Sequence, residues 1–562
     1  MTTPDKYRRA ARSGTAFPLT GLLIASLSVL AASASAQTIP DAGRLLDDIQ
    51  PPRQLQKNNV EALPAPLPRS PLQLPADIKI HVEAIRISGA QAVPTAQLQA
   101  LVADLIGGQH SLAELGQGAG RITQYYRQAG YLLARAYLPT QEIKDGVIDI
   151  QVLEGRLGKL SLNNQSGFSD ERIREQVADI TPDQALRSDT VERNLLLLSD
   201  IPGLVVRSTL SPGATLGSTD LDIQVKNGKP YDGSVSVDNL GNRYTGEARF
   251  NGNVTLNNPF GLGDALQFNA LSSGSGLVYG RLGYQLPLNR QGSRIGVAYT
   301  QMRYRLGEEF SNLDAHGTAR VASVYLLHPL LRSRQANLNL QINIDHKELD
   351  DNIDLTATTT SKTLNNLTVG LSDYRNDDGG ISHGNLSVTA GKLKLDADSA
   401  VLDALGHNTQ GHFVKGNAQL GRLQRLSQQW SLSAQLSAQY AGNNLTSTEK
   451  MSLGGVYGVR AYPQGEAPAD DAWLLNLELR ADITAQAQAL LFYDSAQGRL
   501  YHKPIAGDGD NRRSLSGVGT GIRWSGPEGL SLQASIAWRT DDAPTSDKDK
   551  LPRAWLQLAK RF

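Results

Sequence analysis

Cysteine is absent from the 562 residues, and neither sign of charge is in excess. Without cysteine there is no disulfide framework, no thiolate metal site and no cysteine nucleophile. Lys and Arg total 55, as do Asp and Glu, so charge gives no reason to expect a nucleic-acid partner. Beyond the N-terminus, no stretch offers the ~18 apolar residues of a membrane helix. This length allows about three to four ordinary domains, or small domains with one large barrel.

Sequence signatures of common enzymes are missing as well. The chain has no Gly-x4-Gly-Lys phosphate loop, no His-Glu-x2-His zinc helix and no Gly-x-Ser-x-Gly before a helix. The nine histidines are scattered, and four of them fall in predicted loops: His316, His346, His407 and His502. Paired acids such as Asp377-Asp378 lie in predicted turns, where a solvated role is favoured. We therefore expect no enzymatic activity, no cofactor and no metal site.

The N-terminus has the pattern of a targeting segment. An arginine-rich start is followed by an apolar run from Phe17 to Leu30 and by the small residues Ala34-Ser35-Ala36. This order predicts a secretory signal peptide over residues 1–36. A membrane anchor is the alternative, but the apolar core is short and ends in small residues. The mature chain is then expected in or beyond the periplasm.

A short amphipathic helix and a linker follow. Leu45, Leu46 and Ile49 lie on one face of a helix predicted within residues 37–50. Prolines recur through residues 51–77, as is typical of a linker. A lone helix on a flexible tether cannot bury its apolar face by itself, so it is expected to dock on something larger. A disordered leader is the alternative.

Two α/β modules are predicted over residues 78–155 and 156–228. Each has the order strand, helix, helix, strand, strand, and the first module ends in a strand with alternating apolar residues. In the first module the expected elements are a strand over 78–87, helices over 95–106 and 112–129, and strands over 134–138 and 147–153. The repeated unit resembles the POTRA domain, a periplasmic binding module. Two unspecified α/β domains are the alternative.

From residue 229 to 562 the chain reads as a meander of about sixteen strands. In residues 337–345, for example, Leu and Ile alternate with Asn, Gln and Asp. Short connections alternate with long ones, as in barrels of the outer membrane. The long connections are expected near 303–317, 346–363, 393–411, 441–470, 495–514 and 541–552. We predict an all-β transmembrane barrel of about sixteen antiparallel strands; a soluble sandwich is the alternative.

The order of these parts resembles the two-partner secretion transporters of the outer membrane. The sharpest local likeness is Gly458-Val459-Arg460-Ala461-Tyr462 in the predicted loop 441–470, where the family has Val-Arg-Gly-Tyr. Ala461 replaces the family glycine, a change that a position with positive φ would strain. The resemblance implies that this loop folds back into the barrel lumen.

A second likeness is Phe492-Tyr493-Asp494, which is similar to the family's barrel-wall motif. The resemblance implies that Asp494 pairs with Arg460. A carboxylate in a partly dehydrated lumen is a suitable charge-assisted partner for arginine. The alternative is that Arg460 is one solvated loop arginine among many. The helix that carries Leu45 is expected to plug the lumen.

The resemblance implies export of an unfolded partner exoprotein, such as a haemagglutinin, haemolysin or toxin, without ATP. The barrel is then expected in the outer membrane and its lipid, with the POTRA-like modules in the periplasm. Periplasmic chaperones and the barrel assembly machinery are expected partners in biogenesis. A factor that inserts other barrels is the alternative function, and a passive porin is a third class that client-binding modules disfavour.

Overall fold

A computed structural model describes residues 39–49, 79–131, 133–215 and 217–562. The expected signal peptide over residues 1–36 and the linker over residues 51–77 lie outside the described residues. In the part of the chain that is described, no helix is long and apolar enough to cross a membrane.

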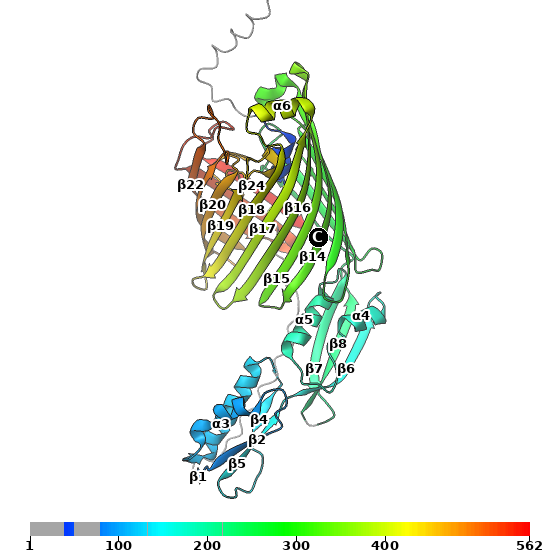
Figure 1. Cartoon of the computed structure of the whole chain (residues 1–562), viewed down its shortest axis with the longest axis vertical. Coiled ribbons are helices and arrows are strands. Elements are labelled where there is room, and N and C mark those ends of the chain that lie inside the picture. Colours follow the sequence, from blue (N-terminus) through cyan, green and yellow to red (C-terminus); the bar gives the residue numbers. More distant parts are fainter. Residues whose placement is uncertain (1–38, 50–78, 132, 216) are drawn as a thin grey trace, which may run out of the picture. The chain divides into compact units, whose positions relative to one another are not determined.

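Sixteen antiparallel strands form one closed barrel, which confirms the predicted fold (Figure 1). Each strand pairs with the next along the chain, and β24 closes the ring by pairing with β9. The strands are β9 (Tyr231–Asp238), β10 (Arg249–Asn257), β11 (Ala265–Ser272), β12 (Leu277–Pro287), β13 (Arg294–Arg305), β14 (Ala315–Arg332), β15 (Ala336–Ile353), β16 (Thr358–Asp377), β17 (Gly380–Leu395), β18 (Gly411–Arg425), β19 (Trp430–Ala441), β20 (Asp471–Asp482), β21 (Ala487–Arg499), β22 (Arg512–Ser525), β23 (Leu530–Arg539) and β24 (Arg553–Arg561).

The connections at one end of the barrel are short, and those at the other end are mostly long. Short turns such as 378–379 and 426–429 contrast with the connection 442–470. Several connections contain a helical turn, namely η2 (Glu308–Leu313), η3 (Asp354–Thr356), α6 (Ala397–Leu405), η4 (Ser447–Glu449) and η5 (Pro527–Gly529). The alternation expected for an outer-membrane barrel is therefore present.

The predicted long loop at 346–363 is wrong. Strands β15 and β16 continue through this region and pair as far as Ile353 and Thr358, so that only a four-residue connection, 354–357, remains. Here the strands carry His346, Lys347 and a run of acidic residues on both faces. A strand with polar residues on both faces has no apolar alternation, and its sequence is therefore similar to that of a loop.

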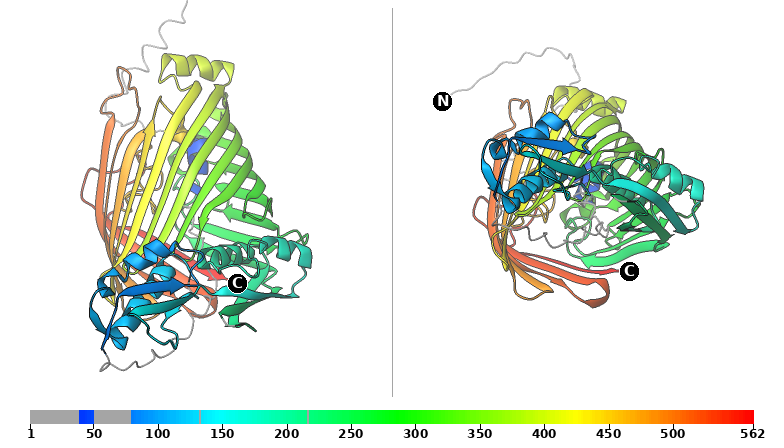
Figure 2. Two further views of the ribbon diagram at one scale, coloured as in Figure 1. Left: turned by 60° about the horizontal axis from the view of Figure 1, so that its bottom comes forward. Right: turned by 90° about the horizontal axis from the view of Figure 1, so that it is seen from below.

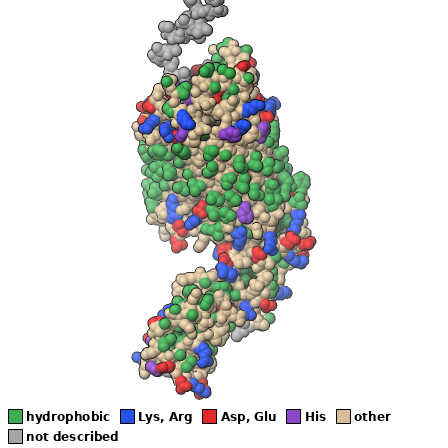
Figure 3. Space-filling view, in the orientation of Figure 1, with side chains coloured by type: hydrophobic (Ala, Val, Ile, Leu, Met, Phe, Trp, Pro, Cys, Tyr) green, Lys and Arg blue, Asp and Glu red, His purple; other side chains and the backbone are tan. Residues whose placement is uncertain are grey.

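On the face of the barrel seen in Figure 3, an apolar belt lies between two zones of charged side chains. On β16, for example, the outward-facing Leu367, Val369 and Leu371 are exposed although they lie in mid-strand. Apolar side chains on the outer face and polar ones on the inner face are the pattern of a barrel in lipid.

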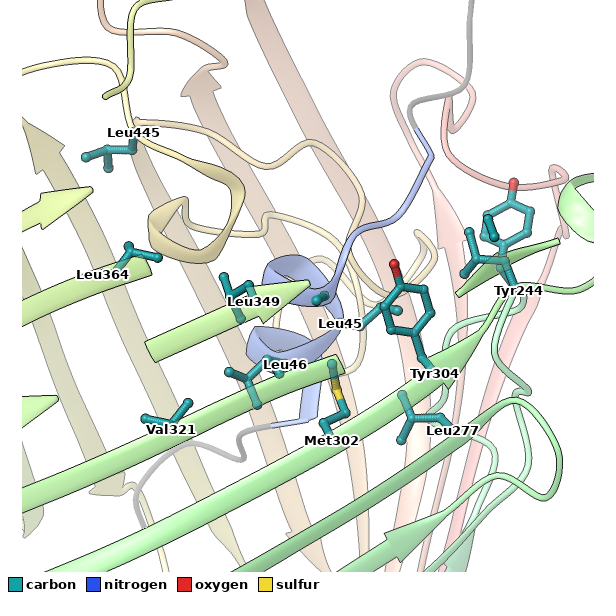
Figure 4. Packing of buried hydrophobic residues seen from close by; sticks show 14 of the residues in the cluster. Leu45, Leu46, Tyr244, Leu277, Met302, Tyr304, Val321, Leu349, Leu364 and Leu445 are labelled. Atoms are coloured by element: carbon teal, nitrogen blue, oxygen red, sulfur yellow. The ribbon is translucent and has the colours of Figure 1, made fainter. Parts of the chain in front are cut away.

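Helix α1 (Ala42–Ile49) lies inside the ring of strands (Figures 2 and 4). The Asp41 carboxylate accepts a hydrogen bond from the Arg44 backbone N–H at 3.0 Å, which satisfies one of the free N–H groups at the helix start. Leu45 and Leu46 are 1% and 2% exposed and pack among apolar residues of the barrel wall, and Ile49 lies at the edge of the same cluster. The predicted helix is confirmed.

The first POTRA-like module has a three-stranded sheet in the order β2-β5-β4 and a separate pair β1-β3. Its helix α3 begins at a capping box, in which Ser111 and Glu114 each accept a hydrogen bond from the other's backbone N–H, at 3.2 and 2.7 Å. The elements are β1 (Lys79–His81), β2 (Ala84–Ser88), α2 (Thr95–Ala100), η1 (Ala103–Leu105), β3 (Gln109–Ser111), α3 (Leu112–Gln128), β4 (Arg135–Tyr137) and β5 (Val147–Leu153).

Two details of this module differ from the sequence expectation. The single strand predicted over 78–87 is broken, because the N–H groups of Val82 and Glu83 turn to the carbonyls of Gly108 and Gly146. The helix predicted over 95–106 changes to a 3-10 turn, because the N–H groups of residues 101 and 102 bond three residues back instead of four.

The second module has a sheet in the order β6-β8-β7, with β6 and β8 parallel. Its core forms between this sheet and two helices and includes Leu157, Ile173, Leu195 and Ile223. The elements are β6 (Arg156–Gln165), α4 (Asp170–Gln176), α5 (Ser188–Ser199), β7 (Leu204–Pro212) and β8 (Ser218–Asn227). The strand-helix-helix-strand-strand order predicted from the sequence is present.

Candidate functional site in the barrel lumen

The connection between β19 and β20, residues 442–470, folds against the inner wall of the barrel. Leu453, Val459, Ala461 and Tyr462 are buried and share one apolar cluster with inward-facing residues of β20, β21 and β22. We call this connection the lumen loop. A long loop buries its side chains in this way only if its polar groups also find partners.

Arg460 and Asp494, which the resemblance pairs, form a bidentate ion pair. The Arg460 Nε and Nη2 donate to the two oxygens of Asp494 at 2.8 and 2.7 Å, and the Arg460 backbone N–H donates to the same carboxylate at 3.1 Å. Arg460 is 6% exposed and Asp494 is fully buried. The Asp494 carboxylate therefore holds both the side chain and the backbone of the loop to strand β21.

Glu478 of strand β20 is a second partner of the loop arginine. Its carboxylate accepts from Arg460 Nη1 at 2.6 Å, and also from Arg480 and Arg523 at 2.6 and 3.1 Å. Three cations thus share two buried acids in one network, with Asp494 as the other acid. Sequence reasoning did not assign Glu478, although its position on the polar face of an alternating strand was a usable signal.

The other motif residue of the wall, Phe492, lies beneath the guanidinium. The Arg460 Cζ is 3.5 Å from the centre of the Phe492 ring, a cation–π contact. Gly519 of the neighbouring strand provides room for this ring, because a Cβ atom at position 519 would lie 2.2 Å from it. The indole Nε1 of Trp555 donates to the Arg460 carbonyl oxygen at 2.8 Å. The tip is thus held from three strands.

Ala461 fits the tip of the loop without backbone strain. Ala461 is not among the residues with positive φ, so the position does not require glycine for its conformation. Its methyl group faces Gly517 of β22, where a Cβ atom would come within 2.6 Å of the Ala461 Cβ. A glycine in the wall therefore accommodates the alanine in the loop.

Gly458 and Val459 form the tight turn before the arginine. The Val459 N–H donates to the Leu453 carbonyl at 2.8 Å, which closes the turn. A Cβ atom at Gly458 would lie 2.3 Å from the same carbonyl oxygen, so a side chain there would displace the turn. Asn476 donates to the Gly458 carbonyl at 3.0 Å and to Asp494 at 2.8 Å. The turn and the ion pair thus share one wall residue.

Tyr462 and Glu466 attach the loop to the connection 540–552. The Tyr462 hydroxyl donates to the Asp542 carbonyl at 2.7 Å. The buried Glu466 carboxylate accepts from the backbone N–H and the hydroxyl of both Thr545 and Ser546, and from Arg513 at 3.1 Å. Burial raises the pKa of Glu466, but these hydrogen bonds outweigh it and hold the pKa below its usual value. Sequence reasoning missed this anchor.

The lumen loop also contacts helix α1. Asp41 binds Lys362 of the wall and Ser447 of the loop, each at 2.6 Å. The Arg44 guanidinium donates to the carbonyl of Gly465, and Gln464 donates to Asp48 at 3.3 Å. The helix containing Leu45, Leu46 and Ile49 is therefore held partly by the wall and partly by the loop.

One group of described residues has metal-ligand chemistry but lies elsewhere. Atoms of Asp314, His316 and Asp354, at the long-connection end, lie within 4.8 Å of one another. Asp314 already pairs with Arg305 at 3.1 Å. We assign no metal to this cluster.

Comparisons with known proteins agree with this architecture. The sequence profile of the haemolysin secretion/activation protein family ShlB/FhaC/HecB matches residues 217–524, and that of the ShlB-type POTRA domain matches residues 80–155. The chain is 29% identical to the heme/hemopexin transporter protein HuxB of Haemophilus influenzae strain 86-028NP, over 95% of this chain and 97% of that protein. It is 24% identical to the outer membrane transporter CdiB of Dickeya dadantii, over 78% and 79% of the two chains. The solved structure of CdiB from Escherichia coli has the same fold, with a TM-score of 0.68, 20% identity and coverage of 90% and 94%.

Proposed function

Since the chain belongs to the haemolysin secretion/activation protein family, we propose that it threads an unfolded client through a lumen that helix α1 and the lumen loop occupy at rest. The protein is a two-partner secretion transporter of the outer membrane, with its POTRA domains in the periplasm. Its partner is a secreted exoprotein, and we propose a haemagglutinin-, haemolysin- or toxin-like client. The proposal contains no enzymatic step.

Client capture begins at strand edges of the POTRA domains. Within the described residues, β2 pairs only with β5, and residues 160–165 of β6 pair only with β8. Each strand therefore has one edge whose N–H and C=O groups are available to an extended peptide. Addition of a client strand there provides backbone hydrogen bonds, while neighbouring side chains provide selectivity.

Release of helix α1 is the next step. The helix has eight residues, and in the described chain it contacts the barrel wall and the lumen loop through side chains. A helix this short is not stable alone in water, so its order depends on docking in the lumen. A client that enters the lumen competes for the same space, and the helix leaves.

The lumen wall suits a sliding polypeptide. On β15 the inward-facing side chains include Asn339, Gln341 and Asn343, whereas those of Leu338, Leu340, Ile342 and Ile344 face outward. Polar uncharged groups exchange hydrogen bonds with a moving chain and offer little apolar surface for it to adhere to. Folding of the client outside then prevents its return and gives export a direction without ATP.

Biogenesis of the transporter itself completes the proposal. We propose that periplasmic chaperones deliver the chain and that the barrel assembly machinery inserts it. The aromatic end of the last strand, where the Phe562 and Tyr231 rings lie 6.5 Å apart, is a suitable element for that recognition. Insertion of other barrels, the alternative function, has no specific support here, because the matched family and the relatives above carry secretion and transport names.

The observation that carries the proposal is the lumen loop held to the wall by Arg460. The test is secretion of a candidate exoprotein into the medium, with and without this chain. We expect secretion with the intact chain and its loss with Arg460→Ala. The matched control is Arg281→Ala, because Arg281 is on the polar face of β12 and, among the described residues, bonds only Thr300 at 3.2 Å. Full secretion with Arg460→Ala would remove the loop from the mechanism, and depletion that lowers other outer-membrane barrels would favour the assembly factor.

A further inference from the structure

A groove of about 580 Å³ lies on the outer wall of the barrel, across strands β15 to β20. Leucines form most of its sides, and four of them are exposed to the exterior, namely Leu371, Leu386, Leu420 and Leu436. Since these side chains belong to the apolar belt, the groove opens to lipid and not to the lumen. Its volume is within the range of small-molecule sites.

Two small residues create the groove. Gly384 on β17 has no side chain and Ala434 on β19 has only a methyl group, and both face the same way as the exposed leucines of their strands. A Cβ atom at Gly384 would lie 3.3 Å from the Leu420 side chain, which shows that this leucine leans over the glycine. The belt is therefore recessed at this place.

Charged side chains line the rim at the short-connection end. Asp373 and Arg375 follow Leu371 on the outward face of β16, and Arg422 follows Leu420 on that of β18. Arg422 holds Asp377 with two hydrogen bonds of 2.6 and 2.8 Å. The Arg375 Nε is 3.3 Å from Asp373. The rim thus contains two cations and two carboxylates, with no net charge.

The spacing between rim and groove fits a phospholipid. Arg375 is four positions beyond Leu371, about 13 Å along a strand at ~3.3 Å per residue. Charged residues on a lipid-facing surface lie at the level of the headgroups, so the leucines lie at the level of the acyl chains. The short connections lie at the end where the POTRA domains enter the barrel, which is the periplasmic side.

We propose that this groove binds one ethanolamine phospholipid of the periplasmic leaflet. An acyl chain lies between the leucines, and its glycerol end lies over Gly384 and Ala434. These two residues pair with Asp373 and Arg422 of the rim. The phosphate meets Arg375 and Arg422, and the ammonium group meets the rim carboxylates. A headgroup with both signs of charge leaves the rim neutral, whereas an anionic glycerol headgroup adds a negative charge that the rim does not balance, because both rim arginines are already paired with carboxylates.

The test is native mass spectrometry of the full chain in detergent, after removal of lipid and addition of phosphatidylethanolamine or phosphatidylglycerol. We expect one tightly retained phosphatidylethanolamine per barrel. Ala434→Trp fills the groove and should reduce retention by about tenfold, equivalent to ~1.4 kcal/mol. The matched control, Ala390→Trp, adds the same side chain to the exposed outward face of β17 beyond the groove and should retain the lipid. Equal retention by the two variants would overturn the proposal.

A second variant tests the rim without changing the groove. Asp373→Asn removes a negative charge and should shift the preference toward phosphatidylglycerol. An unchanged preference, or equal retention of the two lipids by the unaltered protein, would also overturn the proposal. Migration of the unheated barrel in gel electrophoresis verifies that each variant is assembled. Export activity does not enter either readout, so failure of the proposed secretion function would leave these results interpretable.

Discussion

The lumen holds two segments that are retained in different ways. The lumen loop is continuous with strands at both ends. It is anchored by buried ion pairs of Arg460 with Asp494 and Glu478, and by the hydrogen bonds that Thr545 and Ser546 donate to the Glu466 carboxylate. Helix α1 docks through Leu45 and Leu46 and through a few polar contacts. The difference indicates a division of roles, in which the loop is part of the wall and the helix is a removable occupant.

The energetics favour the same division. Removal of one partner from a buried ion pair typically costs about 3–5 kcal/mol, because the other charge is left buried and unpaired. Burial of a leucine side chain contributes roughly 1.5–3 kcal/mol. Ordering each residue of a docked peptide costs ~1–2 kcal/mol of conformational entropy. For an eight-residue helix this entropy cost exceeds what two leucines contribute, so docking also depends on the polar contacts of the helix, and its hold on the lumen is weaker than that of the loop.

The largest expected effect is that of Asp494→Ala. The substitution leaves the buried Arg460 guanidinium with Glu478 as its acidic partner and should weaken the loop by about 3–5 kcal/mol. We expect export to fall to background while the barrel still assembles. Limited proteolysis of the loop, together with secretion of the client, measures both. The double variant with Arg460→Ala should be no worse than either single variant, and additive losses would show that the two residues act separately.

Deletion of residues 38–50 should give the next largest effect. The deletion empties the space that α1 occupies, so the ion conductance of the barrel in planar bilayers should rise several-fold. Proteolysis of the lumen loop should change far less than in Asp494→Ala. This result would show that the loop keeps its position without the helix. Unchanged conductance would mean that the helix does not obstruct the pore.

A smaller change is expected from Lys362→Gln. This substitution removes the cation that binds Asp41 at 2.6 Å but leaves the apolar contacts of the helix. We expect a partial rise in conductance, well below that of the deletion. Lys450→Gln is the matched control, because Lys450 binds Asp470 within the loop at 3.1 Å and its charge partners are not on the helix; its conductance should stay near the original level. Equal conductance in both variants would show that the contact between Lys362 and Asp41 does not help to dock the helix.

Mild acid should leave the ion pairs of Asp41 and Glu449 intact but should tighten the docking of helix α1. Burial raises the pKa of Asp41 and Glu449, but nearby lysines outweigh it, and each pKa is lowered to about 2. A group with a lowered pKa stabilises the folded state above its ordinary pKa and loses this contribution as the pH falls toward 2. Burial raises the pKa of Asp47 on the helix to about 7, so this carboxyl takes up a proton as the pH falls from about 8 to about 5, and the cost of burying its charge is relieved. Conductance should therefore decrease slightly from about pH 8 to about pH 5 as the helix docks more tightly. Constant conductance over that range would show that Asp47 does not affect docking of the helix.

Much of the architecture was predictable because local sequence patterns indicate it. The alternation of apolar and polar residues predicted the barrel strands, and the small residues before Arg460 indicated the tip of the loop. Partners far apart in the chain have no such local signature. Glu466 and Thr545 are 79 residues apart, and nothing in either segment alone indicates that they meet. Likewise, the polar ends of β15 and β16 could not be told from a loop, because no apolar face was left to alternate.

Contacts between α1 and the lumen loop have one more consequence, which concerns linkage. Arg44 binds the Gly465 carbonyl and Asp41 binds Ser447, so each segment stabilises the position of the other. Such coupling is reciprocal: whatever free energy the loop lends to the docked helix, the helix lends to the seated loop. Departure of the helix thus lowers the barrier to any later movement of the loop. The lumen then opens in a fixed order: helix α1 leaves first, and its departure makes movement of the lumen loop easier.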